Sequence, residues 1–347
     1  MPIIMKNLIK TFVVLTLLFS LQFCNTDDLS NITEIVINVS KKNALVDEEI
    51  NLSAMANNGK NITDEITFYV NDTEIQGQSF TPNLVGIYTV KGMYEGIESN
   101  SVEIEVKAPT GYSQKVLVED YTGVWCGYCP RVAYSIQQIQ ANSDYTSRIV
   151  PAAIHLYDDN DPYYCEDGGA LKDAFQISGL PKGRINRTIS WTSPQEDNLD
   201  QVTNLIGDSA PLGIALETSV LNNTLNASIR IGFAQDFSDL GVVVYLLENG
   251  LIHNQTNYTS FFGGDYILTD FEHNDVLRKV YTDIYGDAIP NTESVTDNVY
   301  HFDLQEMLPD NIENQENLTL VVFVVDKNTN TVINAQKVEV GEEQGFD

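Results

Sequence analysis

The stretch Trp125-Cys126-Gly127-Tyr128-Cys129-Pro130 decides how this sequence is interpreted. It follows an apolar run that starts at Val116 and is typical of a strand, and it leads into a segment with helical character. Two cysteines with this spacing at such a junction form a dithiol/disulfide pair. The positive end of the helix dipole would stabilise Cys126 as a thiolate, the nucleophile of disulfide exchange. Cys129, one turn later, would then be the resolving thiol.

Three further residues complete the candidate catalytic site. Asp120, six residues before Cys126 on the expected strand, could move protons to and from Cys129 if burial raises its pKa. The alternative is a solvated acid at a strand end. Trp125 directly precedes the first cysteine. Pro181 is expected to follow a cis peptide bond and to help seat a partner beside Cys126, whereas a trans loop proline is the alternative.

Residues 1–23 are expected to be a lipoprotein signal peptide. Lys6 and Lys10 precede an apolar run over residues 11–19, which is shorter than the about 20 apolar residues that cross a membrane. The run ends at Leu21-Gln22-Phe23-Cys24, which resembles the lipidation motif of bacterial lipoproteins. Phe23 departs from that motif, because a small residue normally stands before the cysteine, and a spacer cysteine is the alternative. We expect a lipid anchor at Cys24, followed by a tether over residues 24–31.

Charge and spacing exclude several kinds of ligand. The formal net charge of −30 argues against nucleic acid or an anionic membrane surface as a partner. In the acidic segment 158–167, Asp158, Asn160 and Asp161 offer hard oxygen ligands for calcium. The segment lacks the EF-hand pattern, so a solvated loop is favoured over a calcium site. The histidines have no zinc-type spacing, and no metal or cofactor is expected.

Cys165 should be a passive free thiol, because neighbouring acids raise a thiol pKa.

The chain divides into three stretches by pattern. Short β runs separated by Asn, Gly and Asp turns predict a small immunoglobulin-like β-sandwich over residues 32–108, followed by a linker at 109–111. Strands alternate with helices over 112–208, which predicts a layered, thioredoxin-like α/β domain. Long β runs over 209–347 predict a C-terminal β-sandwich. The expected fold class is therefore multidomain, α/β plus all-β.

The block from Leu117 to Pro130 closely resembles the signature of the Omp28-related outer membrane lipoproteins of Bacteroidetes. Ile154-His155, Gly179-Leu180-Pro181 with Asn186-Arg187, and residues 273–278 are similar to later landmarks of that family. The resemblance covers roughly Lys115 to the C-terminus. It implies a thioredoxin-like domain followed by a β domain on a cell-envelope lipoprotein, with the N-terminal sandwich as an added module. It implies no particular activity, because the family is named for its location.

Two functional hypotheses follow from these residues. The first is an outer-membrane lipoprotein, on the periplasmic or the cell-surface face, whose cysteine pair exchanges with thiols and disulfides of extracytoplasmic proteins. The second is a non-catalytic binding, adhesion or scaffold lipoprotein whose cysteine pair is only a structural disulfide. They differ in whether the cysteine pair forms a mixed disulfide with another protein. The sequence sets neither the direction of the redox chemistry nor the oligomeric state.

Overall fold

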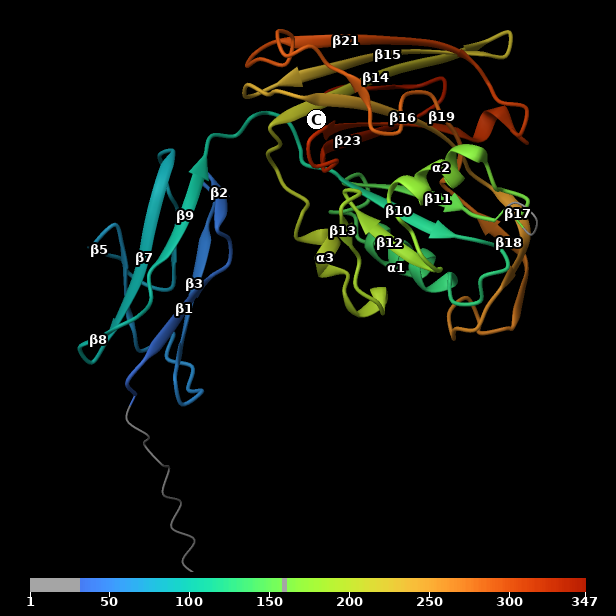
Figure 1. The fold of residues 1–347 in the computed structure, drawn as a ribbon. Coiled ribbons are helices and arrows are strands. Elements are labelled where there is room, and N and C mark those ends of the chain that lie inside the picture. The colour runs from blue at the N-terminus through green and yellow to red at the C-terminus, as the bar shows by residue number, and fades with distance from the viewer. Residues whose placement is uncertain (1–31, 158–160) are drawn as a thin grey trace, which may run out of the picture. The chain divides into compact units, whose positions relative to one another are not determined.

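The computed structural model describes residues 32–157 and 161–347, which fall into two compact units (Figure 1). Unit 1 ends at Lys107, and unit 2 runs from Ala108 to Asp347. The expected signal peptide, Cys24 and the tether lie outside the described residues. Within the described ranges, no helix combines the length and the apolar character that crossing a membrane requires.

Unit 1 is built from two sheets around one hydrophobic core. Strand β3 alternates buried and exposed side chains along its length, as expected for a strand with one face on a core. Both sheets supply that core, with Ile37 and Ile50 from one and Phe68 and Ile104 from the other. The immunoglobulin-like assignment of this unit stays a prediction. The sheets are β1 (Ile35–Val39), β3 (Ile50–Ala56) and β6 (Ser79–Phe80), and β2 (Asn43–Leu45), β9 (Val102–Lys107), β7 (Gly86–Tyr94), β4 (Thr67–Val70), β5 (Thr73–Glu74) and β8 (Ile97–Glu98).

Unit 2 is organised around one nine-stranded sheet. Its strands in spatial order are β13 (Ile189–Ser190), β12 (Lys182–Ile185), β10 (Val116–Thr122), β11 (Ile149–His155), β19 (Val276–Val280), β16 (Leu240–Glu248), β22 (Leu318–Asp326) and β23 (Val332–Glu339), with β20 (Asp287–Ala288) beside β16. A second sheet contains β21 (Val299–Met307), β15 (Thr224–Phe233), β14 (Leu212–Leu221) and β24 (Glu343–Gln344). Strands β17 (Leu251–Thr256) and β18 (Ile267–His273) form a separate two-stranded hairpin.

The helices of unit 2 are few and short. They are α1 (Pro130–Gln140), α2 (Glu166–Ala174) and α3 (Asp200–Thr203), with the 3-10 turns η2 (Gln195–Asp197) and η3 (Gln315–Asn317). Helix α1 covers one face of β10 and β11, where Val132 and Ile136 pack against Val118 and Ile149. Leu171 of α2 belongs to a different core, which also includes residues of β10, β11, β16 and β22. The two faces of the β10–β11 pair are therefore covered by different elements.

Strands β16 and β22 hold unit 2 together because they are buried on both faces. Their sequences are nearly continuous apolar runs, as expected for strands without a solvent-exposed side. Val242 and Val244 enter a core shared with β14 and β15, whereas Val243 and Tyr245 enter the core shared with β10 and β11. Full burial of each such aliphatic side chain stabilises the fold by about 1.5 to 3 kcal/mol.

The predicted fold class is wrong. The structure is mostly β, and it has no central thioredoxin-like α/β domain separate from a C-terminal β-sandwich. Strand β11 pairs in parallel with β19, Ala153 opposite Val276, so the strands of residues 112–208 continue into the sheet of the C-terminal strands. Local patterns specify elements but not which distant strands pair. The domain limits given above stay predictions.

Candidate functional site

The two cysteines of the motif form a disulfide in the turn between β10 and α1. Their sulfurs are 2.08 Å apart and their Cα atoms 5.4 Å apart, which confirms that the spacing brings them together. Cys126 and Cys129 are 6% and 2% exposed. Helix α1 starts at Pro130 with Cys129 as its N-cap, so Cys126 lies in the turn before the helix. Proline fits here because the N–H of the first helical residue has no partner within the helix.

Asp120 lies on β10 beneath this helix start and is 3% exposed. Its Oδ1 atom has no hydrogen-bond partner. Burial raises its pKa from 3.8 to about 8. Asp120 is therefore a buried acid rather than a solvated acid at a strand end. A carboxyl group with a pKa in this range can both donate and accept a proton near neutral pH.

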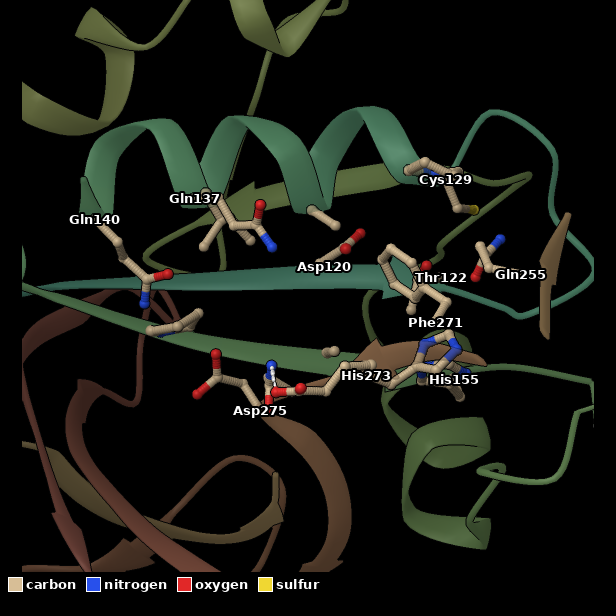
Figure 2. Close-up of a pocket in the computed structure, with 17 residues that line it drawn as sticks. Asp120, Thr122, Cys129, Gln137, Gln140, His155, Gln255, Phe271, His273 and Asp275 are labelled. Carbon is tan, nitrogen blue, oxygen red and sulfur yellow. Dashed lines mark hydrogen bonds between the residues drawn. The ribbon is translucent and has the colours of Figure 1, made fainter. Parts of the chain in front are cut away.

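A cavity of about 100 Å³ joins this acid to the disulfide and to two histidines (Figure 2). It lies between β10, β11 and α1 and is bordered by residues of β17 and β18. Its polar lining includes Asp120, Thr122, Cys129, Gln137, His155, Gln255 and His273. The cavity thus brings together side chains from segments that are more than a hundred residues apart in the sequence.

The hairpin of β17 and β18 is hydrogen-bonded to the backbone of the cysteine motif. The amide of Thr256 donates to the carbonyl of Val124 at 2.8 Å, and the amide of Tyr258 donates to the carbonyl of Gly127 at 2.6 Å. The buried Gln255 side chain donates from Nε2 to the carbonyl oxygens of Cys126 at 3.1 Å and Gly123 at 3.3 Å. Four carbonyls of the motif and of the residues just before it therefore accept hydrogen bonds from the hairpin.

Gly127 is required by this arrangement. A Cβ atom at this position would lie 2.4 Å from the ring of Tyr258, closer than van der Waals contact allows. In the sequence, residues 258–262 and 273–278 interrupt the β pattern of the C-terminal stretch, and this pattern does not predict the hairpin. The signal that could have shown it is the pair Gly263-Gly264 between two β-like aromatic segments.

Two histidines that are far apart in sequence meet at the cavity. The rings of His155 and His273 are 5.4 Å apart, and both contact Tyr163 at 5.3 Å. His155 Nδ1 lies 2.9 Å from Asp161 Oδ1, and Asp161 Oδ2 accepts a hydrogen bond from the amide of Val124 at 2.7 Å. Burial, and secondarily His155, lowers the pKa of His273 to about 3. Among residues 32–157 and 161–347, no group of His, Cys, Asp and Glu is arranged to hold a metal ion.

Asp161 corrects one expectation about the acidic segment. It is buried against His155 and the backbone of Val124, so the prediction of a solvated loop is wrong for this residue. Asp158 and Asn160, the other candidate calcium ligands, lie outside the described residues. The carboxylate of Asp161 therefore helps to fix the approach to the cysteine motif.

The family profile described as "Outer membrane protein Omp28" matches residues 169–344, just over half of the chain. The chain belongs to the Omp28 family. This membership indicates a location in the cell envelope. A search of the curated proteins finds no match.

Solved structures similar to this Omp28 protein include HBP35 of Porphyromonas gingivalis, with a TM-score of 0.52 and 18% identity over 67% of this chain and 76% of that chain. This likeness shows a shared fold alone. The fibronectin(III)-like modules of Clostridium thermocellum CbhA match with a TM-score of 0.26 and 10% identity over 88% of this chain and 94% of theirs. A TM-score this low supports no argument about the Omp28 protein.

Pro181 and Trp125 are the remaining candidate residues of the Omp28 protein. The Leu180–Pro181 peptide bond is cis, and β12 starts directly after it. Lys182 pairs with Tyr121, so Pro181 lies at the end of β10 that leads into the motif. Trp125 is 40% exposed, and its ring contacts that of Tyr157 edge-on at 5.5 Å. Catalytic roles for Cys126, Cys129, Asp120, Trp125 and Pro181 stay predictions.

Cys165 of the Omp28 protein is a free thiol at the start of α2. Its Sγ donates to the carbonyl of Leu277 at 3.5 Å. Burial is the main cause that raises the pKa of this thiol to about 11, and Asp167 contributes less. The expected direction of the shift is therefore right, but burial, rather than the acidic neighbours, dominates. A thiol with this pKa is almost entirely protonated near neutral pH, so it is a poor nucleophile.

Proposed function

We propose that this Omp28 protein exchanges its Cys126–Cys129 disulfide with thiols and disulfides of other extracytoplasmic proteins. The observation that supports the proposal best is the buried Asp120, whose unpartnered Oδ1 lies in the wall of the cavity that Cys129 also lines. A structural disulfide needs no titratable acid beside it. Such a group is unfavourable to bury, and perturbed acids of this kind cluster at functional sites.

The proposed exchange transfers two electrons from a dithiol of the partner to the Cys126–Cys129 disulfide. A thiolate of the partner attacks the sulfur of Cys126, a new disulfide bond forms between the proteins, and the Cys126–Cys129 bond breaks. The electron pair goes to the sulfur of Cys129, which takes up a proton. Asp120, protonated up to about pH 8, is placed to supply it through the cavity. The second thiolate of the partner then displaces Cys126, so the partner leaves oxidised and this protein is reduced. The same steps in reverse reduce a partner disulfide.

The proposal is tested by catalysed reduction of insulin with dithiothreitol. We expect the wild-type protein to accelerate the reaction over dithiothreitol alone and Cys126→Ser to remove the acceleration, because serine cannot form the mixed disulfide. Cys165→Ser serves as the matched control and should retain the wild-type rate. Equal rates for Cys126→Ser and wild type would exclude the exchange function.

A second function is favoured by one observation. Both cysteines are nearly buried, and the hairpin of β17 and β18 covers the motif, as expected of a structural disulfide in a non-catalytic binding or scaffold lipoprotein. In that case neither wild type nor Cys126→Ser accelerates insulin reduction, and Cys126→Ser lowers the stability instead. A lost disulfide typically costs about 2 to 5 kcal/mol.

We also propose that a lipid on Cys24 holds the protein at the outer membrane. Support comes from the motif that ends at Cys24 and from membership of an outer membrane protein family. Two acyl chains anchor a protein stably in a membrane. A single chain gives only marginal binding, with an association constant of about 10⁴ M⁻¹. We expect Cys24→Ala to move the protein from the membrane fraction to the soluble fraction, while Cys165→Ser leaves it membrane-bound. An unchanged distribution for Cys24→Ala would contradict the anchor.

A further inference from the structure

Exposed aromatic side chains lie next to the cysteines in the chain and on the hairpin that is hydrogen-bonded to the motif. Trp125 and Tyr128 come from the motif itself, and Tyr258 and Tyr266 come from the hairpin of β17 and β18. Their exposed fractions are 40%, 53%, 51% and 64%. We call these four residues the aromatic rim. Large aromatic side chains gathered at one exposed place mark a surface that another molecule covers.

Three residues of the rim contact one another, whereas Trp125 contacts Tyr157. The ring of Tyr258 stacks on that of Tyr266 at 5.3 Å and meets that of Tyr128 edge-on at 5.5 Å. The hydroxyl oxygens of Tyr258 and Tyr266 are 3.4 Å apart. Behind the rim, Phe261 of the same hairpin stacks on Tyr134 of α1 at 4.2 Å. The hairpin is thereby fixed both to the cysteine motif and to the helix that follows it.

The position of the rim limits what can cover it. A partner that exchanges with Cys126 must bring its own sulfur within bonding distance of a side chain that is only 6% exposed. The residues beside the partner's cysteine must therefore lie on the surface immediately around the motif, and that surface includes the rim. A bulky folded surface fits such a site less well than an extended segment does.

The negative charge of the protein limits which extended segments can bind at the rim. The protein carries a formal net charge of −30, which repels acidic segments. The cation beside the rim, Arg131, lies 5.9 Å from the ring centre of Tyr128 and is paired with Glu196 at 3.4 Å. The rim therefore offers aromatic faces and edges, and a segment with an aromatic side chain next to its cysteine matches them best.

We propose that the aromatic rim selects extended, non-acidic polypeptide segments that carry an aromatic residue beside the reacting cysteine. The inference rests on the proposed exchange function and names its substrate class. Tyr258 and Tyr266 are the specificity-determining residues, because they come from the hairpin rather than from the cysteine motif. A small disulfide without a polypeptide chain reaches Cys126 without contacting the rim.

The test uses the reduced full-length protein and two short peptides. Each peptide carries one cysteine as a mixed disulfide with glutathione, and the two differ only in having phenylalanine or serine beside it. The thiolate of Cys126 attacks the peptide sulfur, glutathione leaves as a thiolate, and Cys129 then releases the peptide thiol as the protein disulfide re-forms. Each rate is divided by the rate of the same peptide with dithiothreitol, which removes differences in intrinsic reactivity. Hydroxyethyl disulfide, which has no peptide chain, is measured alongside.

We expect the phenylalanine peptide to react about fivefold faster than the serine peptide, as one aromatic contact in the transition state provides. Tyr266→Ala and Tyr258→Ala should each bring this ratio close to one. Tyr285→Ala, at a tyrosine that is 40% exposed and contacts Phe175, is the matched control and should keep the wild-type ratio.

The failures of the two proposals are distinguishable. If wild type reacts with hydroxyethyl disulfide but shows the same ratio as Tyr266→Ala and Tyr258→Ala, the rim does not select substrates and this inference is wrong. If wild type reacts with none of the two peptides and hydroxyethyl disulfide, the proposed exchange function is wrong. The inference about the rim is then wrong as well.

Discussion

Replacing Arg187 with methionine should lower the free energy of unfolding of unit 2 by about 3 to 5 kcal/mol. Arg187 and Glu119 are completely buried, and the Nε of Arg187 lies 3.5 Å from Oε1 of Glu119. Methionine has similar length but no charge, so the carboxylate of Glu119 would be left in an apolar core without its cation. Removal of one partner from a buried pair is much more damaging than removal of both.

Arg187 belongs to a buried network that connects several strands of unit 2. Its Nη2 donates to the hydroxyl of Tyr245 at 2.5 Å, and that hydroxyl donates to Glu119 at 2.9 Å. The guanidinium lies 4.6 Å from the ring centre of Phe323 and 4.9 Å from that of Phe175. Burial already raises the pKa of Glu119, and Arg187 opposes that shift. The network thus joins β10 to β16 and β22, across the predicted boundary between residues 208 and 209.

Denaturant unfolding followed by tryptophan fluorescence measures this effect. Both tryptophans, Trp125 and Trp191, lie in unit 2, so the signal reports that unit alone. The partly exposed Arg184 on β12 provides the matched control, and Arg184→Met should cost less than about 1 kcal/mol. The double variant Glu119→Leu with Arg187→Met should recover part of the loss, because no charge then remains buried. A loss below 1 kcal/mol for Arg187→Met alone would show that the pair contributes little.

The part of the candidate site that could be predicted is the part encoded locally. Cys126, Cys129 and Asp120 lie within one strand, turn and helix, so their spacing fixes their relation through backbone geometry. The alternation of side chains along β10 sends Asp120 toward α1 and Glu119 toward the opposite face. The placement of the acid below the disulfide follows from this short segment without knowledge of the rest of the fold.

The part that could not be predicted depends on pairing between distant strands. His273 and the hairpin reach the motif only because β19 joins β11 in the sheet, which no local pattern specifies. For the same reason the strands of residues 112–208 were assigned to a separate domain. An apolar strand can bury its two faces against helices or against further strands. Its sequence is the same in both cases, so it does not show which of them covers the strand.

Replacing Asp120 with asparagine should remove a dependence of stability on pH that the buried acid creates. The native carboxyl keeps its proton up to about pH 8, whereas in the unfolded chain its pKa returns to the ordinary 3.8. Between these values the native state binds more protons than the unfolded state, so the free energy of unfolding falls as the pH rises. Asparagine does not titrate, and between about pH 4 and pH 8 we therefore expect the stability of Asp120→Asn relative to wild type to rise by on the order of 6 kcal/mol.

The difference between wild type and Asp120→Asn, measured by urea unfolding of the oxidised proteins at a series of pH values, isolates this acid. Wild type alone would not, because the lowered pKa of His273 gives a slope of opposite sign between about pH 3 and its ordinary value of 6.5. Asp173→Asn, at an exposed carboxyl on α2, is the matched control and should give a curve parallel to wild type. Parallel curves for Asp120→Asn as well would mean that Asp120 is ionised in the native state. An ionised Asp120 could not give a proton to Cys129, so the proposed exchange would need another proton donor.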